Sequence, residues 1–453
     1  MITQTFTIAR NTFVESVRQP VVFVLLLAAG AIQIFNNAST AFAMGMTETS
    51  EVSSDDKLLL DIGLSAVFGL GTLLAAFVAT AVMSREVEQK TILTVVSKPV
   101  GRPWIVLGKY LGVAGTILVA TLTMLLFLLL GIRHGVLSTA ADDIDWPVLV
   151  FGGSAVAGAL ILAAWCNYFY GWSFPQLVVT LLLPFTFLAY IGVLFVSDKW
   201  EFQEISHDFK PQITIASSLL IVAVLVFTAI ATAASVRLGQ VMTIVVCAGI
   251  FLASLLSNYF LGQHAFVNTL VAQIDQAKIV APPTAEQGST PGPDQIWEVR
   301  LREPPLVPLQ PGMPFYYGGS PSGFPMKTPE FAPYEGPIES GGILNAPRPA
   351  MVITAVDGRN LTFRYAGQAP MVGLAGPPQS GDYLFVTPTK TRPHFLIAWA
   401  VMPNMQHFWL LDAVSQNQLI PPRHVVLVAF YGVAQVGVFL SLAVILFQRR
   451  DVG

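Results

Sequence analysis

Residues Ser84–Gly112, SREVEQKTILTVVSKPVGRPWIVLGKYLG, form a charged segment between two long apolar runs. The chain has 453 residues, of which 54% are hydrophobic and 11% charged, with a net charge of −3. An ordinary globular domain is about 25% charged, so this chain has too few charges to cover a soluble surface. The composition predicts an integral membrane protein, and the near-neutral charge gives no argument for nucleic-acid binding. The segment itself holds seven charged residues: Arg85, Glu86, Glu88, Lys90, Lys98, Arg102 and Lys109.

The apolar runs predict about eight transmembrane helices, because each reaches the length of roughly 18 residues that a bilayer crossing needs. Backbone amides in hydrocarbon must be satisfied within their own segment, so the runs are expected to be helical. The uncharged stretch 146–197 is long enough for two crossings. Pro184 leaves open that one span is a re-entrant pair. The predicted spans are 20–36, 58–83, 104–132, two within 146–197, 212–236, 241–262 and 424–447.

Lysine and arginine predict the orientation, since they are enriched in short cytoplasmic loops. With the N-terminus inside, the inside segments hold ten Lys and Arg residues and the short outside loops hold four. Both termini are therefore predicted to be cytoplasmic, in a cell (inner) membrane. The predicted parts are an interfacial amphipathic helix at 1–19, a transmembrane domain at 20–262 with a cytoplasmic loop at 84–103, an insert at 263–423, and a last transmembrane helix with a basic tail at 424–453.

The insert at 263–423 is rich in proline and glycine and has no run of spanning length. After seven crossings it is expected outside the cytoplasm. Residues 351–356 and 361–365 flank an Asp-Gly pair, which predicts a β-hairpin because glycine supplies the positive φ of a tight turn. IWEVRL at 296–301 and DYLFV at 382–386 predict further strands. The expected fold class is an all-α polytopic membrane protein with an inserted extracytoplasmic β-rich domain, in which residues 280–345 are irregular or disordered.

Sequence patterns for catalysis are missing from the chain. The nearest approach to a P-loop runs from Gly101 to Gly108-Lys109, with six intervening residues where the motif needs four. The six histidines have no helical i, i+4 pair, so neither a zinc site nor another cofactor is expected in this chain. The two cysteines lie in or beside apolar runs and predict no disulfide. The acidic loop that contains Asp142, Asp143 and Asp145 is expected to be solvated.

The order of features in the charged segment resembles a known family. The residues from Glu86 to Gly112, E-x-E-x-x-T-I-L-T-V-V-S-K-P-V-G-R followed by L-G-K-Y-L-G, resemble the cytoplasmic coupling loop in permeases of type-2 ATP-binding-cassette (ABC) exporters. IARNTFVESVRQP at 8–20 looks like the interfacial elbow helix of that family. Residues 231–243, 403–414 and 431–453 are similar to its late segments. The family core usually has six helices, so the hairpin at 146–197 is expected to be an addition.

The resemblance implies that the chain is the permease subunit of an ABC exporter and contributes half of the translocation path. Its partners would be a cytoplasmic ABC ATPase, which binds the ATP, and a second copy or a similar permease, within the lipid bilayer. The residues that would contact this ATPase or shape the contact are Glu86, Glu88, Thr91, Lys98, Pro99 and Arg102. The sequence does not indicate the substrate.

Two other functions remain open at this point. One is a membrane-anchored binding or sensory module whose β-rich part detects an external ligand, although eight spans exceed what an anchor needs. The other is a membrane-embedded enzyme, which would require a set of catalytic carboxylate, histidine or serine residues that the sequence does not provide.

Overall fold

A computed structural model describes most of the chain and divides it into two compact units. Unit 1 comprises Met1–Ala253 and Met405–Gly453, and unit 2 comprises Ser254–Asn404. The second unit begins and ends earlier in the sequence than the insert expected at 263–423. The described residues are 2–40, 51–88, 101–136, 144–281, 295–319, 334, 336, 338, 343, 350–367, 377–387, 390–410, 414 and 420–449.

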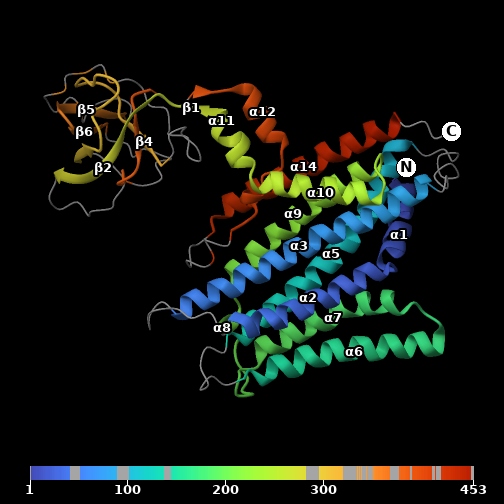
Figure 1. Ribbon diagram of the computed structural model, residues 1–453. Helices are drawn as coiled ribbons and strands as arrows, with labels where there is room; N and C mark the ends of the chain where they lie inside the picture. Colours follow the sequence, from blue (N-terminus) through green and yellow to red (C-terminus); the bar gives the residue numbers. More distant parts are fainter. Residues whose placement is uncertain are drawn as a thin grey trace. The chain divides into compact units, whose positions relative to one another are not determined.

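Helices form nearly all of unit 1 (Figure 1). Proline stands in the first turn of α5, α6, α7, α9 and α14, where its missing N–H leaves no intrahelical hydrogen bond unmade. The helices are α1 (Ile2–Val17), α2 (Pro20–Thr40), α3 (Glu51–Glu88), α5 (Arg102–His134), α6 (Trp146–Tyr170), α7 (Phe174–Phe195), α8 (Ile205–Asp208), α9 (Pro211–Ser235), α10 (Gln240–Leu255) and α14 (Pro422–Gln448).

Within the described residues, seven helices are long and apolar enough to cross a membrane: α2, the 57–82 part of α3, α5, α6, α7, α9 and α14. Helix α7 continues through Pro184. The predicted span at 241–262 is different, because α10 is followed by a π-helix, η1 (Asn258–Gly262), and α11 (Gln263–Ala265), with a bend of 58°. The sequence-based count of eight therefore holds if this bent pair crosses as one span.

Helices α3, α5 and α9 form the centre of unit 1, since more than half of each apolar segment is buried (Figure 1). Aromatic rings link α3 to α9 and α10: Phe68 lies 6.0 Å from Phe227 and 5.2 Å from Phe251, measured between ring centroids. The segment before α14 belongs to this core as well, through Met405, Phe408, Val414 and Ile420. This packing explains why the second unit ends at Asn404 and not at 423.

Helix α1 packs along α5 at a row of glycines. A side chain at Gly112 would put its Cβ 2.5 Å from the Ala9 carbonyl oxygen and 2.5 Å from the Thr12 Cβ. Gly108 and Gly112 have the small-xxx-small spacing that lets two helices approach closely. The sequence-based prediction of a helix near 1–19 agrees with α1, and its location at a membrane surface stays a prediction.

The described strands of unit 2 form a two-stranded ladder and a six-stranded antiparallel sheet. The ladder pairs β1 (Phe266–Val267) with β8 (Lys390–Thr391). The order in the sheet is β4 (Tyr316–Gly318), β7 (Tyr383–Phe385), β2 (Leu270–Ala281), β3 (Ile296–Leu301), β6 (Asn360–Ala366) and β5 (Ala350–Asp357).

One segment closes this sheet into a small barrel. Immediately before β4, the Phe315 N–H donates to the Met351 carbonyl and the Ile353 N–H donates to the Met313 carbonyl, both at 2.9 Å. The residues before β4 thus pair with β5, and β4 itself pairs with β7 at the other edge. The interior is filled, because the Phe315 and Phe363 rings stack with centroids 4.1 Å apart.

The β5–β6 hairpin confirms the prediction at 351–365, with Asp357 opposite Asn360. Gly358 has φ +57°, at the first of two turn residues, which fits a type II′ turn. The strands predicted at 296–301 and 382–386 correspond to β3 and β7. Most of the irregular stretch predicted at 280–345 lies outside the described residues.

The glycine row makes a prediction about stability. Gly112→Ala should destabilise unit 1 by about 1–3 kcal/mol, because the added methyl overlaps a backbone carbonyl that cannot move aside as a flexible side chain would. The measurement is the thermal unfolding midpoint of the purified protein in detergent. Gly69→Ala in α3 is the control, since a Cβ there meets no atom within 4 Å. An equal midpoint for the two variants would contradict the packing of α1 on α5.

Candidate functional site

The residues predicted to contact an ATPase lie at and beyond the end of α3. Glu86 and Glu88 are in its last turns, and the positions of their side chains are not described. Thr91, Lys98 and Pro99 lie outside the described residues. Arg102 is described and begins α5. The contacts of the Arg102 side chain therefore describe the site at the point where the charged loop ends and α5 begins.

The Arg102 side chain binds the C-terminal end of α14. Its Nη1 donates to the Gln448 carbonyl at 2.9 Å, and its guanidinium carbon lies 6.0 Å from the centroid of the Phe447 ring. The last four carbonyls of a helix have no intrahelical partner, and a cation is favourable there because of the helix dipole. Arg102 thus stabilises the end of the last span.

A second arginine binds the same helix end. Arg237 follows α9, and its Nε donates to the Leu446 carbonyl at 3.1 Å. The Phe447 side chain is buried among Val106 of α5 and Ala233 and Val236 around the end of α9. We call Arg102, Arg237 and residues 446–448 the α14 clamp. It joins the exit of the charged loop, the turn after α9 and the end of α14.

The sequence did not predict the α14 clamp as a contact within the chain. The sequence places Arg102 among the residues that would contact an ATPase and Arg237 between two apolar runs. Both acceptors are backbone carbonyls, which have no signature in a sequence. The one feature of the sequence that could have indicated these contacts is the position of each arginine at the boundary of an apolar run.

A second polar cluster lies at the opposite ends of α5 and α9. Arg133 Nη1 is 2.5 Å from Asp145 Oδ2, and Arg133 Nε is 2.9 Å from Asp208 Oδ2. The latter pair lies at ion-pair distance without the alignment of a hydrogen bond, since Arg133 Nε has no hydrogen-bond partner. Asp145 Oδ1 also accepts from the Val148 N–H at 3.2 Å and caps α6. The Arg133 cluster, composed of Arg133, Asp145 and Asp208, therefore ties α6 and α8 to the end of α5.

Burial makes this cluster important for stability. The Asp145 side chain is 5% exposed and the Arg133 side chain 15%. The expectation that Asp145 belongs to a solvated loop is therefore wrong, because this buried residue caps α6 and pairs with the largely buried Arg133. Asp142 and Asp143 lie outside the described residues.

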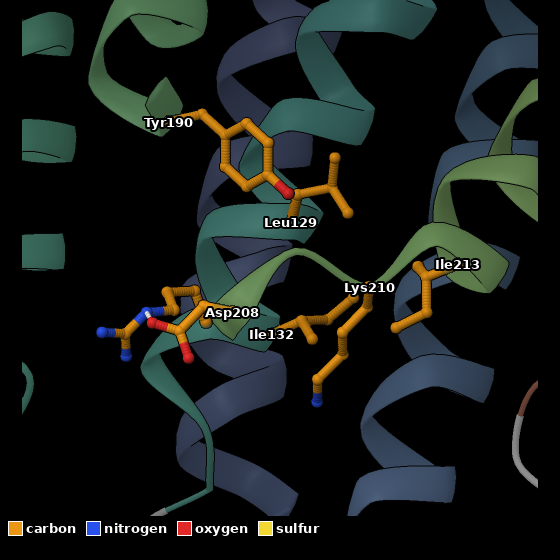
Figure 2. Close-up of a pocket in the computed structure, with 7 residues that line it drawn as sticks. Leu129, Ile132, Tyr190, Asp208, Lys210 and Ile213 are labelled. Carbon is orange, nitrogen blue, oxygen red and sulfur yellow. Dashed lines mark ion pairs between the residues drawn. The ribbon is translucent and has the colours of Figure 1, made fainter. Parts of the chain in front are cut away.

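A small pocket of about 100 Å³ adjoins the cluster (Figure 2). Drug-sized ligands occupy pockets of roughly 300–1,000 Å³, so this space suits a few water molecules and does not provide a translocation path. Figure 2 shows the Tyr190 ring, the Asp208 carboxylate and the Lys210 side chain around it. Its walls are formed by Leu129, Ile132, Arg133, Tyr190, Asp208, Lys210 and Ile213.

No group of three His, Cys, Asp or Glu residues is arranged to hold a metal ion among the residues that the structure describes.

His407, before α14, has a ring centroid 5.5 Å from that of Tyr431. Burial lowers the pKa of His407, and the nearby His424 lowers it further. The neutral imidazole is thus favoured at this position.

The spanning helices of unit 1 define a multi-pass membrane protein. Within it, residues 61–240 match the family described as "ABC-2 family transporter protein". The match covers less than half of the chain, agrees with the resemblance noted in the sequence, and supports an ABC-2 type permease. It includes Arg102, Arg237, the Arg133 cluster and the α6–α7 hairpin. Searches of curated proteins and of solved structures found no match.

The Arg133 cluster leads to a prediction about stability. Arg133→Leu should cost about 3–5 kcal/mol, because it leaves the buried Asp145 carboxylate without its cation. The measurement is thermal unfolding in detergent. Lys199→Leu is the control, an exposed cation in the same unit, for which little change is expected. Adding Asp145→Asn and Asp208→Asn to Arg133→Leu should recover part of the lost stability, because the unpaired carboxylates are then removed. A midpoint for Arg133→Leu equal to that of the control would refute a stabilising role of the cluster.

Proposed function

We propose that this chain is the membrane-spanning permease subunit of an ABC exporter, that it forms part of the translocation path, and that a separate ATPase drives it. The observation that carries the proposal is the α14 clamp. Through Arg102, the clamp connects the residue that follows the charged loop to the end of the last spanning helix. A displacement of Arg102 would therefore act directly on the end of α14.

Hydrogen bonds at the two ends of α14 support the topology in this proposal. The Ile420 N–H donates to Gln212 Oε1 at 3.1 Å, so the start of α14 lies beside the start of α9. Arg237 joins the end of α9 to the end of α14. The two helices are therefore parallel, and the chain must return across the membrane once between them. Helix α10 with η1 and α11 is the apolar segment available for that crossing among the described residues.

With this return crossing added to the seven long apolar helices, the chain has eight spans. Both termini and the loop at 84–103 then lie on the cytoplasmic face. Unit 2 then lies outside the cytoplasm. The excess of arginine and lysine in the inside segments agrees with this orientation, and we propose a cell (inner) membrane as the location.

The proposed mechanism is a rigid-body movement between two arrangements of packed helices. ATP binding would close two ATPase subunits, and each would push on the charged loop of one permease. Glu86, Glu88, Thr91, Lys98 and Pro99 would provide the contact, and Arg102 would transmit the movement to α14. The assembly requires a second permease, either a copy of this chain or a similar one.

The barrel gives no support to the alternative of a ligand sensor. Its interior is filled by buried side chains, among them Trp297, Phe315 and Phe363. A ligand would therefore have to bind on the outside of the barrel.

Charge reversal tests the coupling. Glu88→Lys and Arg102→Glu should each reduce co-purification with the ATPase, and stimulation of its activity, by about tenfold or more, as expected when one partner of a charged contact is lost. Lys199→Glu, an exposed reversal outside the loop, should leave both unchanged. Arg237→Gln distinguishes docking of the ATPase from transmission of its movement. This variant should still co-purify with the ATPase but should stimulate its activity less. Unchanged association in both loop variants would refute the docking role of the loop.

Cysteine labelling tests the orientation. In a background with Cys166→Ala and Cys247→Ala, Leu306→Cys should react with an impermeant maleimide added to intact cells, because this position is 75% exposed in unit 2. Gln240→Cys, at the start of α10, should react only after permeabilisation. The opposite pattern would mean that the topology is inverted, and reaction of both from outside would exclude a crossing by α10.

A further inference from the structure

Lys210 and Asp208 bring opposite charges to the pocket beside the Arg133 cluster, and they are not paired with each other. Lys210 directly precedes α9, and Asp208 ends α8. Within the part of the chain that the structure describes, the Lys210 ammonium has neither an ion pair nor a hydrogen bond. In Figure 2 both side chains lie at the end of the pocket away from the Tyr190 ring. One small space therefore contains a lysine cation and a carboxylate that do not neutralise each other.

The Asp208 carboxylate uses one of its two oxygens within the chain. Its Oδ2 accepts a hydrogen bond from Gln203 Nε2 and lies 2.9 Å from Arg133 Nε. Among the described residues, Oδ1 has no donor, although an ionised carboxylate can accept about four hydrogen bonds. Because the Asp208 side chain lines the pocket and is 21% exposed, a donor that enters the pocket can reach this carboxylate.

The charges around the pocket balance only at separate points. Arg133 carries one positive charge and faces two carboxylates, those of Asp145 and Asp208. One positive and two negative charges leave −1 in this cluster, and Lys210 adds +1 at a different point of the pocket wall. A lone anion would be attracted by Lys210 and repelled by the carboxylates, and a lone cation would meet the opposite conflict. A ligand that carries both charges matches the pocket.

The size and the position of the pocket narrow the choice of ligand. A water molecule occupies about 30 Å³ in the liquid, so a volume of about 100 Å³ holds one small polar group. Leu129, Ile132 and Ile213 provide an apolar wall. The pocket lies near the ends of α5 and α7 and the start of α9. The ends of spanning helices lie at the boundary between hydrocarbon and lipid head groups, which favours a phospholipid as the ligand.

We propose that this pocket binds the phosphoethanolamine head group of a phospholipid. The primary ammonium of the lipid donates to Asp208 Oδ1, and its phosphate accepts from Lys210, both as charge-assisted hydrogen bonds. The Tyr190 hydroxyl, which has no hydrogen bond among the described residues, is a further donor in the same wall. Phosphatidylcholine has the same charges, but its methylated nitrogen has no N–H to donate. The proposal rests on the membrane class of the protein and not on its coupling to an ATPase.

The first test is native mass spectrometry of the purified protein with equal amounts of phosphatidylethanolamine and phosphatidylcholine that have the same acyl chains. The protein should retain the ethanolamine lipid about tenfold more than the choline lipid, because the choline lipid lacks one charge-assisted hydrogen bond. Equal retention of the two lipids would overturn the proposal.

Two variants assign the two halves of the head group. Lys210→Gln should lower retention of both lipids about tenfold, because both contain the phosphate. Asp208→Asn should remove the preference for ethanolamine and leave retention of the choline lipid unchanged. Lys199→Gln is the control, an exposed lysine outside the pocket. Equal retention by Lys210→Gln and Lys199→Gln would overturn the proposal, and this comparison is decisive even if Asp208→Asn does not fold.

Thermal unfolding in detergent distinguishes the lipid from a free head group. Phosphatidylethanolamine should raise the unfolding midpoint of the wild-type protein, since a ligand that binds only the folded state stabilises it. Soluble glycerophosphoethanolamine at the same concentration should not, because it lacks the acyl chains that concentrate the lipid in the micelle around the protein. An equal rise with the soluble compound would overturn the membrane as the source of the ligand.

Discussion

The hydrogen bonds at the two ends of α14 are the constraint on which the path of the chain depends. Gln212 accepts a hydrogen bond from the Ile420 N–H just before this helix, and Arg102 and Arg237 bind carbonyls at its end. In a lipid environment no hydrophobic force drives helices together, so packing and hydrogen bonds between the helices determine their arrangement. These contacts make α9 and α14 parallel. Because α9 and α14 are parallel, the chain must cross the membrane once between them. In the proposed topology, this crossing determines the side on which the barrel lies.

Polar contacts are concentrated near the helix ends, and small residues are found where helices touch along their length. The Arg133 cluster and the α14 clamp lie at opposite ends of α5, while Gly108 and Gly112 lie between them. This distribution is physically reasonable, because charged pairs are less costly at the boundary than in the hydrocarbon. Helix α5 therefore has a fixed position at both ends and a close-packed neighbour, α1, near its beginning.

Most of the membrane helices were predictable, because each depends on a local property of its own residues. The run of apolar residues around α9 and the proline at its start are both visible in the sequence. The β5–β6 hairpin was predictable for the same reason, since Gly358 and two flanking strands are adjacent. The contacts that unite the parts were not predictable. Arg133 meets Asp208, and Arg102 meets the Gln448 carbonyl, only after distant segments have packed together. The bend after α10 has no proline to indicate it.

Closure of the barrel affects whether strands of two copies of the chain can pair with each other. An open sheet exposes unpaired N–H and C=O groups along its outer strands, which are templates for aggregation. Here Phe315 and Ile353 use those groups within the chain. In the proposed assembly, two permeases would bring two such units into one complex. Among the described residues, the outer strands of the six-stranded sheet are therefore already paired within one chain, which disfavours strand exchange between two copies.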